Sequence, residues 1–436
     1  MITRHPLYQT ADRIKNALMV NGFELADDGV LPEIVKIEQD AVLYDLPADL
    51  ERKPIILDTQ EHILRRTLLP EFLSKTEVRI PLRKFVCGRV FDANDSDHPA
   101  HYCIEGVLSG PDMKYAGILE LFNRISVSLC GFGAKAEITE FALNCYEIRF
   151  TGPGGNCFTF CHISFAKWAA KAILGLEDYT NKTWLFTADV DQIAVSMFGL
   201  NGRQSIFTRD IDFLRSFECA EPAIGDRFST KISDTLRQLG YSEFLGENIY
   251  HEDEYMKMHM FQDEWDENNK AVKLAVPFGD RVGLPTVLIP GLEQALGENC
   301  ASGRQEVRLF EIAHTYLPGA CGRKNPREKI SLAIGAYAPD MTIADFKSDI
   351  DVFLSHLGIR KHFIIKNGVP KAYHREESYL VLNDESMYLG GSLGGINPIA
   401  EENYGIQTHA YMANFNIEPL QKQFHNEIMF RPKELP

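Results

Sequence analysis

The feature that most limits how this chain of 436 residues can fold is a series of sequence patterns that occurs twice, about 220 residues apart. Each copy has two strand-like runs rich in β-branched and aromatic residues, followed by Pro-Asp-Met and an amphipathic segment that ends near a glycine. A helical stretch precedes each copy, over 8–21 and over 230–239. The other predicted elements are strands at 82–91, 102–108, 307–316 and 330–337, and helices at 115–129 and 343–357. The sequence therefore predicts two halves built from the same elements in the same order.

A linker between the halves is indicated by the turn-rich stretch Cys-Ala-Glu-Pro-Ala-Ile-Gly-Asp at 219–226. We therefore predict one domain over 1–218 and another over 227–436. Strands outnumber helices in each half, and short polar turns join them, which favours antiparallel pairing because parallel strands need long crossovers. The predicted fold class is α+β, with two tandem cores that each contain a mostly antiparallel sheet flanked by helices. One large mixed domain is the alternative.

Composition indicates which kinds of partner and which cellular compartment are expected for this chain. Lys and Arg number 45 against 61 Asp and Glu, and the formal net charge of -16 disfavours a surface that neutralises many phosphates. Nine cysteines occur without a CxxC pair, which predicts reduced intracellular thiols. No apolar leader is present, and no uncharged stretch approaches the ~18 residues that span a bilayer. We expect a cytoplasmic protein that does not bind a membrane.

Short motifs in a fixed order carry a family resemblance. In the second half they are Leu239–Glu243, Leu288–Leu292, Val307–Ile312, Asp345–Asp349, Gly395–Pro398 and Phe415–Leu420. In the first half they are His5–Leu7, Gly88–Phe91, Ile104–Gly106 and Arg209–Phe217. The second half resembles the catalytic-core-like module of the β subunit of phenylalanyl-tRNA synthetase, and the first half is similar to the α-subunit core. This resemblance implies two class II synthetase cores joined head to tail, so that one chain imitates a pair of subunits.

The resemblance also implies where a nucleotide would bind, and the sequence departs from the family there. An arginine that follows the Gly-Arg-Val-aromatic strand holds the α-phosphate of ATP in the family, and Asp92 is the matching residue. A Gly-x-Gly-x-Glu-Arg segment supplies a second arginine over the γ-phosphate; residues 187–192 match it, with Asp189 at a glycine, Asp191 at the glutamate and Gln192 at the arginine. Fixed cations stabilise the charge that develops as pyrophosphate leaves, so we expect weak ATP binding. The resemblance alone would imply ATP and Mg²⁺ as cofactors.

The amino-acid pocket implied by the resemblance is altered as well. The family's Phe-Pro-Phe-Thr-Glu-Pro-Ser matches 139–145, where Phe141 remains as a pocket wall. Its Phe-His-Gln-x-Glu-Gly matches 101–106, where Glu105 remains while the family's histidine and glutamine are absent. Arg89 and Glu105 rank first, because strand alternation aims every second side chain at one sheet face. The candidate ligand-pocket residues are Arg89, Asp92, His101, Glu105, Phe141, Asp189, Asp191 and Gln192, with no metal ligand and no catalytic residue assigned.

Several other motifs have both a functional and a structural interpretation. Residues 151–156 could cradle a phosphate, but they lack Gly-Lys-Ser/Thr, which favours a hairpin turn. Cys157, Cys161 and His162 could bind zinc, but their spacing favours core thiols. The acidic stretch over 252–267 is interpreted as a solvated loop rather than a cation site, and the Asp and His residues over 95–98 as a polar turn.

Three hypotheses for the function follow. The first is a synthetase-like paralogue with a degenerate ATP site that binds an amino acid or a related small molecule. The second is an active ATP-dependent ligase that transfers an activated amino acid to tRNA, a carrier or a small acceptor, with cations from Arg65, Arg66 or Arg83. The third is a structural or regulatory partner of another synthetase-like protein.

The resemblance also bears on assembly. The family's β-like core is followed by an anticodon-binding domain, and this sequence ends at Pro436, about where that domain would begin. With the acidic charge, this makes tRNA an unexpected partner for the isolated chain. Class II cores pair in the family, and two copies of this chain would bring four cores together. A homodimer is therefore predicted.

Overall fold

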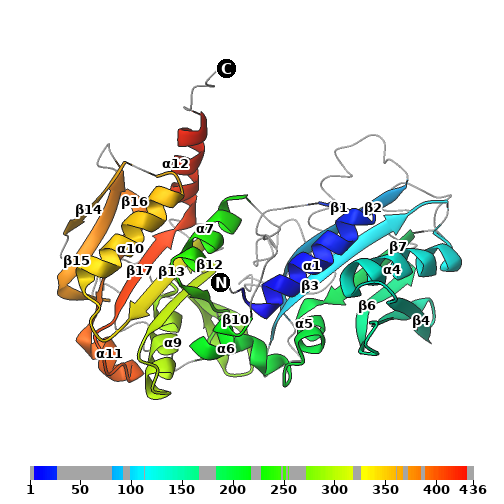
Figure 1. Ribbon diagram of the computed structural model, residues 1–436, viewed down its shortest axis with the longest axis horizontal. Helices are drawn as coiled ribbons and strands as arrows, with labels where there is room; N and C mark the ends of the chain where they lie inside the picture. Colours follow the sequence, from blue (N-terminus) through cyan, green and yellow to red (C-terminus); the bar gives the residue numbers. More distant parts are fainter. Residues whose placement is uncertain are drawn as a thin grey trace.

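The computed structural model describes residues 4–26, 81–91, 99–111, 113–165, 183–217, 227–246, 249–251, 254, 272–317, 326–359, 361–366, 372–383 and 388–429. Predictions that concern Asp92, 95–98, 219–226 and most of 252–267 lie outside these residues. The described parts form two large sheets, each with its own helices (Figure 1). The predicted boundaries of the two domains stay a prediction.

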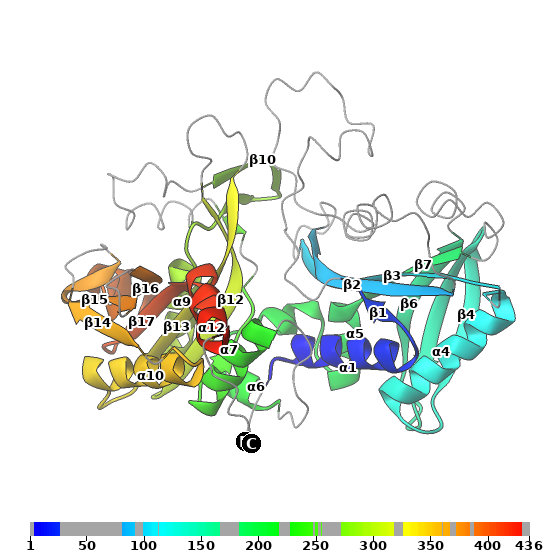
Figure 2. The same ribbon diagram turned by 90° about the horizontal axis from the view of Figure 1, so that it is seen from above.

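The first half forms a seven-stranded sheet. From one edge to the other, the strands are β1 (Glu24–Leu25), β2 (Leu82–Phe91), β3 (Ala100–Ser109), β7 (Thr183–Asp189), β6 (Cys157–Phe165), β5 (Cys145–Thr151) and β4 (Lys135–Ala142). Every neighbouring pair is antiparallel except β1 and β2. The helices α1 (Pro6–Val20), α4 (Tyr115–Cys130) and α5 (Val190–Phe198) lie on one side of this sheet (Figure 2).

The second half repeats this arrangement. Its seven-stranded sheet has the order β8 (Ser242–Glu243), β12 (Val307–Leu317), β13 (Arg327–Tyr337), β17 (Tyr411–Asn416), β16 (Tyr388–Ile396), β15 (Tyr373–Asn383) and β14 (His362–Lys366). The matching helices are α7 (Arg227–Gln238), α10 (Ile343–His356) and α12 (Ile417–Met429). The short first strand is again the parallel one. The predicted α+β class, with two tandem cores of the same element order, is confirmed.

Among the described residues, the second half contains several further elements. A three-stranded sheet contains β10 (Val272–Phe278), β11 (Arg281–Leu284) and β9 (Tyr250–His251), and two further helices are α9 (Ile289–Ala301) and α11 (Pro398–Tyr404). The first half ends with the 3-10 helix η3 (Arg203–Phe207) and the short helix α6 (Ile211–Arg215). None of the helices within the described ranges is long and apolar enough to cross a membrane.

Local sequence signals explain several of these boundaries. The helix α10 begins at a capping box, in which the Thr342 hydroxyl accepts the N–H of Asp345 at 3.3 Å and the Asp345 carboxylate accepts the N–H of Thr342 at 2.8 Å. The glycine-rich segment 151–156 joins the antiparallel strands β5 and β6, so the hairpin interpretation is confirmed. Gly155 supports that turn with a φ of 84°, a conformation that costs little only for glycine.

Strand alternation gives the first sheet two different faces. Phe85, Ile104 and Phe186 point to the side covered by α1, α4 and α5, where they share one buried apolar cluster with Leu121 and Phe122. The intervening residues point to the opposite side, because successive side chains of a strand alternate. That opposite side carries polar residues and is the candidate site described below.

The two cores pack against each other through the end of the first half. Ile211 and Leu214 of α6 are buried in the same apolar cluster as Leu292 and Leu309 of the second core. Burial of both side chains removes apolar area from water and fixes α6 on the second core.

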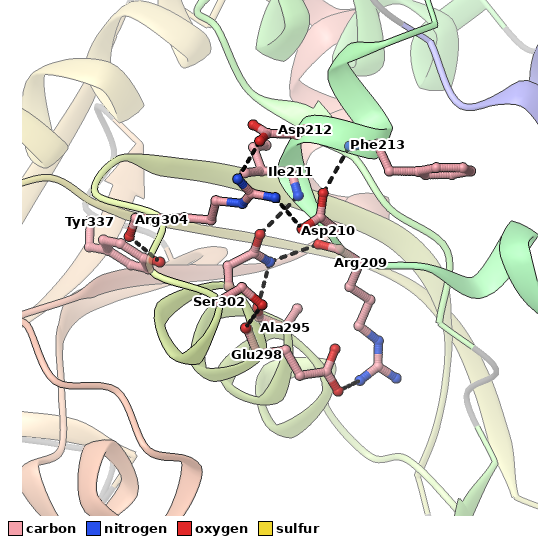
Figure 3. A network of polar contacts seen from close by, with 11 residues as sticks. Arg209, Asp210, Ile211, Asp212, Phe213, Ala295, Glu298, Ser302, Arg304 and Tyr337 are labelled. Atoms are coloured by element: carbon pink, nitrogen blue, oxygen red, sulfur yellow. Dashed lines mark hydrogen bonds and ion pairs between the residues drawn. The ribbon is translucent and has the colours of Figure 1, made fainter.

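Polar groups complete this junction (Figure 3). The Asn299 side chain accepts the N–H of Ile211 at 2.8 Å and donates to the carbonyl of Arg209 at 2.7 Å. The Arg304 guanidinium forms an ion pair with Asp210 at 3.0 Å. Backbone groups at a helix end need such partners when they are buried, so the junction is held by directional contacts as well as by apolar burial.

Candidate functional site

A row of polar side chains crosses the face of the first sheet that is opposite α1, α4 and α5. The strand register places Glu105 of β3 opposite Thr187 of β7, and Thr187 opposite His162 of β6. Glu147 of β5 continues the row beside His162, and its carboxylate accepts the Thr159 hydroxyl at 2.5 Å. Neighbouring strands lie about 4.8 Å apart, so the row offers a carboxylate and an imidazole about 10 Å from each other at the backbone.

Glu105 is the most buried member of this row, with 0% exposure. His101 lies on the same face, four residues earlier on β3, and is also buried. A buried carboxylate is costly unless a cation or hydrogen-bond donors accompany it. Cys103 lies between them, and burial raises the pKa of its thiol, with further contributions from Asp189 and Glu105. Cys103 is therefore a protonated thiol and unsuited to act as a nucleophile.

A second polar group lies where β7 passes into α5. Asp189 caps this helix, since its carboxylate accepts the N–H of Gln192 at 3.0 Å. Arg203 of η3 donates to the other oxygen of Asp189 at 2.5 Å. The carboxylate therefore has both a helix N–H and a guanidinium as partners.

Asp191 lies beside this pair and is almost completely buried. Its carboxylate accepts the N–H of Tyr102 at 3.0 Å, and the Nε of Arg203 lies 4.0 Å away. Burial, and after it the neighbouring charge of Asp189, raise the pKa of Asp191 to about 8. Two carboxylates thus share one nearby guanidinium at the start of α5.

The predicted site residues divide between the two faces of the sheet. Arg89 pairs with Tyr102, whereas Glu105 pairs with Val86, three residues from Arg89 along β2. Because that spacing is odd, Arg89 points to the helix side, near Tyr8 and Asp191, and away from Glu105. The two leading candidates therefore do not contact a common ligand from one face.

The remaining candidates are more scattered. Phe141 lies on the outer strand β4, is 62% exposed, and contacts the ring of His162 edge to face at 5.4 Å between centroids. Gln192 lies in the first turn of α5 with an exposed side chain. Asp92 lies outside the described residues. Together, Asp189, Asp191 and Gln192 form one group and His101 and Glu105 another, with Phe141 at the edge.

Two residues that the sequence did not single out as ligand-pocket residues belong to this arrangement. The sequence associates His162 only with Cys157 and Cys161, as a possible zinc ligand, but Cys161 is buried in the apolar cluster while its neighbour His162 is exposed on the other face. Arg203 pairs with Asp189 across 14 residues of sequence. Alternation within 157–165 could have revealed His162, whereas no sequence signal links Arg203 to Asp189. Within the described residues, no group of three or more His, Cys, Asp or Glu could hold a metal ion.

The equivalent face of the second sheet is occupied by the chain itself. Leu292 and Leu296 of α9 pack against Leu309 and Met412 in one buried cluster. Gly335 of β13 permits this packing, because a Cβ there would come within 2.9 Å of Leu292. The second core therefore buries an apolar helix where the first core presents polar side chains.

Comparison with known proteins agrees with this division into related cores. Residues 220–417 match the family model of the phenylalanyl tRNA synthetase beta chain CLM domain. The β subunit of phenylalanine--tRNA ligase from Clostridium tetani is 26% identical over 162 residues, which cover 37% of this chain and 20% of that protein. The α subunit from Staphylococcus epidermidis is 22% identical over 254 residues, which cover 50% of this chain and 68% of that protein.

A solved structure gives a weaker similarity. The pyrrolysyl-tRNA synthetase from Desulfitobacterium hafniense aligns with a TM-score of 0.38 at 17% identity, over 46% of this chain and 68% of that one. The chain spans about a fifth of the length of the β subunits that it matches. The family model, the relatives of both subunit types and the repeated core together support a phenylalanyl-tRNA synthetase-like protein.

Proposed function

We propose that the first core binds an amino acid, or a related small molecule with a protonated amino group, on the polar face of its sheet, and does not activate that ligand efficiently with ATP. The observation that carries this proposal is the pairing of Asp189 with Arg203 at the start of α5. The family resemblance implies that this segment would contact the phosphates of a nucleotide. The charges found there disfavour phosphate.

The N-terminus of a helix ordinarily attracts anions, because its first N–H groups lack partners inside the helix. In α5 the carboxylate of Asp189 already takes the N–H of Gln192 and neutralises Arg203. A phosphate would have to displace this internal anion or approach it against charge repulsion. Asp191 adds a second carboxylate nearby and makes the local field more negative whenever it is ionised.

The row on the sheet face supports the choice of ligand. Glu105 places a negative charge on this face, and a protonated amino group brought near it would complement that charge. Thr187 and His162 continue from Glu105 across the sheet and offer further polar contacts. A small molecule with an amino group at one end and a polar or aromatic part at the other would match this row.

Isothermal titration calorimetry of the full chain with the common amino acids and their decarboxylated amines tests the proposal. We expect at least one to bind, and Glu105→Gln to weaken that binding by at least about tenfold because it removes the charge. The matched control is Glu120→Gln, at an exposed residue of α4 that pairs with Arg124. An equal loss of affinity in both variants would contradict the proposal. If no amino acid binds and another protein copurifies with the chain, the proposal is also contradicted, and a role as a regulatory partner is favoured.

A second candidate function, an ATP-dependent ligase, is favoured by one observation. Arg203 lies beside the start of α5, close to the place where Gln192 substitutes for the family's arginine. Arg203 could serve as the missing cation if Asp189 released it. ATP–pyrophosphate exchange with a panel of amino acids separates the two functions, because a clear exchange signal that is lost in Arg203→Gln would establish the ligase.

A further inference from the structure

The two long sheets each end in an open edge strand. β4 is the last strand of the first sheet, and β14 is the last strand of the second. They lie at opposite ends of the molecule (Figure 1). Within the described parts of the chain, no strand pairs with the outer side of either one. An open edge presents backbone N–H and C=O groups that can pair with another strand.

Both edges expose apolar side chains as well as backbone. On β14, Phe363 is 54% exposed and Ile365 is 43% exposed. At the other end of the molecule, Phe141 of β4 is exposed, and Leu143 in the adjoining turn is 87% exposed. Exposed apolar groups on an edge strand favour association, and proteins usually place charges there to control it.

The charges on the two edges have opposite signs. β14 is flanked by the exposed cations Lys361 and Lys366, whereas β4 carries the exposed anions Glu137 and Glu140. A single cation, Lys135, begins β4. Two copies of β14 would therefore repel each other, while β4 and β14 attract.

We propose that β14 of one copy of this chain pairs with β4 of a second copy, so that the two sheets continue across the contact. An antiparallel register that sets Lys366 opposite Glu137 places the two opposite charges side by side. The same register sets Ile365 opposite Ile138, which buries apolar side chains between the copies. Lys361 then lies one diagonal step from Glu140, a distance that long side chains bridge.

This contact differs from the closed homodimer predicted from the sequence. It uses two different surfaces of the chain, so a bound pair of copies leaves one β4 edge and one β14 edge free. Such heterologous contacts form rings or open chains rather than stopping at a two-fold pair. Charge attraction should make the association weaker at high salt, because exposed ions are screened.

Charge reversal tests the proposal through analytical ultracentrifugation of the full chain over micromolar to several hundred micromolar concentrations. The first variant, Lys361→Glu with Lys366→Glu, reverses β14; the second, Glu137→Lys with Glu140→Lys, reverses β4. We expect the wild type to associate reversibly and each variant to lose at least about tenfold in association constant. Combining all four substitutions in one chain should restore association, and so should mixing the two variants.

The controls are Glu402→Lys on α11 and Lys422→Glu on α12, two exposed charges away from both edges, which should leave association unchanged. Thermal melts and far-ultraviolet circular dichroism verify that each variant is folded. A wild type that stays monomeric at every concentration in low salt would overturn the proposal. Association that neither reversal changes, or that the fourfold variant fails to recover, would overturn it equally.

Discussion

The two cores have the same strand order, but the equivalent face of the sheet carries polar side chains in the first core and packs against an apolar helix in the second. In the first core that face carries Glu105, Thr187 and His162, whereas in the second it is filled by α9, with Leu292 against Gly335. Within the described residues, the difference lies in the groups that occupy the face rather than in the order of the strands. A shared topology therefore does not imply a shared role, because function depends on which groups occupy the face.

The largest expected effect concerns the packed face of the second core. Leu292→Ala would leave a cavity between α9 and the sheet, and we expect a loss of about 2–5 kcal/mol in the free energy of unfolding of that core. Urea denaturation, with hydrogen exchange of β12 and β13 amides to assign the core, measures it. Thr187→Ala on the first sheet should cost much less stability. If Leu292→Ala weakened amino-acid binding as strongly as it lowers stability, the division of roles would be wrong.

Much of the fold was predictable because it rests on local hydrophobic patterns. The strand predicted at 82–91 is β2, and the helix predicted at 115–129 differs from α4 by one residue at its end. These elements have regular alternation or helical periodicity, and the repeat fixes their order. The Pro-Asp-Met motifs precede both helices as expected.

The composition of the site was harder to predict because it depends on register and on long-range pairing. Arg89 and Glu105 both lie in strands that were predicted correctly, yet they point to opposite faces, which only the pairing of Glu105 with Val86 reveals. Arg203 reaches Asp189 from a separate 3-10 helix. The packing of α9 on the second sheet likewise joins residues that no periodicity connects.

The next largest effect is on the pH dependence of the stability of the first core. Because burial raises the pKa of Asp191 to about 8 in the folded protein, the folded state holds this proton more tightly than the unfolded state does. Its contribution is complete below about pH 4 and is lost as the pH rises toward 8. We expect Asp191→Asn, which can still accept the N–H of Tyr102, to remove that slope and to be more stable than the wild type at pH 8.

Urea midpoints for unfolding, measured from about pH 5 to 8.5, check this expectation. The matched control is Asp340→Asn, an exposed aspartate of the second core, whose pH profile should follow that of the wild type. Parallel slopes in wild type and Asp191→Asn would mean that Asp191 does not distinguish the first core in this way.

The smallest effect concerns the junction that joins the cores. Asn299→Ala would leave the buried N–H of Ile211 without an acceptor, which costs about 1–3 kcal/mol for an unsatisfied group. Arg304→Ala removes ion pairs to Asp210 and Asp212 whose side chains remain partly exposed, so we expect a smaller loss of stability than in Asn299→Ala. Differential scanning calorimetry compares the two variants, and Asn299→Ala should also separate the transitions of the two cores.

This comparison tests what holds two different cores together. Ile211 and Leu214 stay buried in both variants, so apolar burial is unchanged and only the directional contacts differ. If Arg304→Ala separated the two transitions more than Asn299→Ala does, surface charge rather than the buried amide would couple the cores. The expected order follows from burial: Asn299 is almost completely enclosed, so water cannot replace its hydrogen bonds, whereas water can solvate both carboxylates that Arg304 leaves behind.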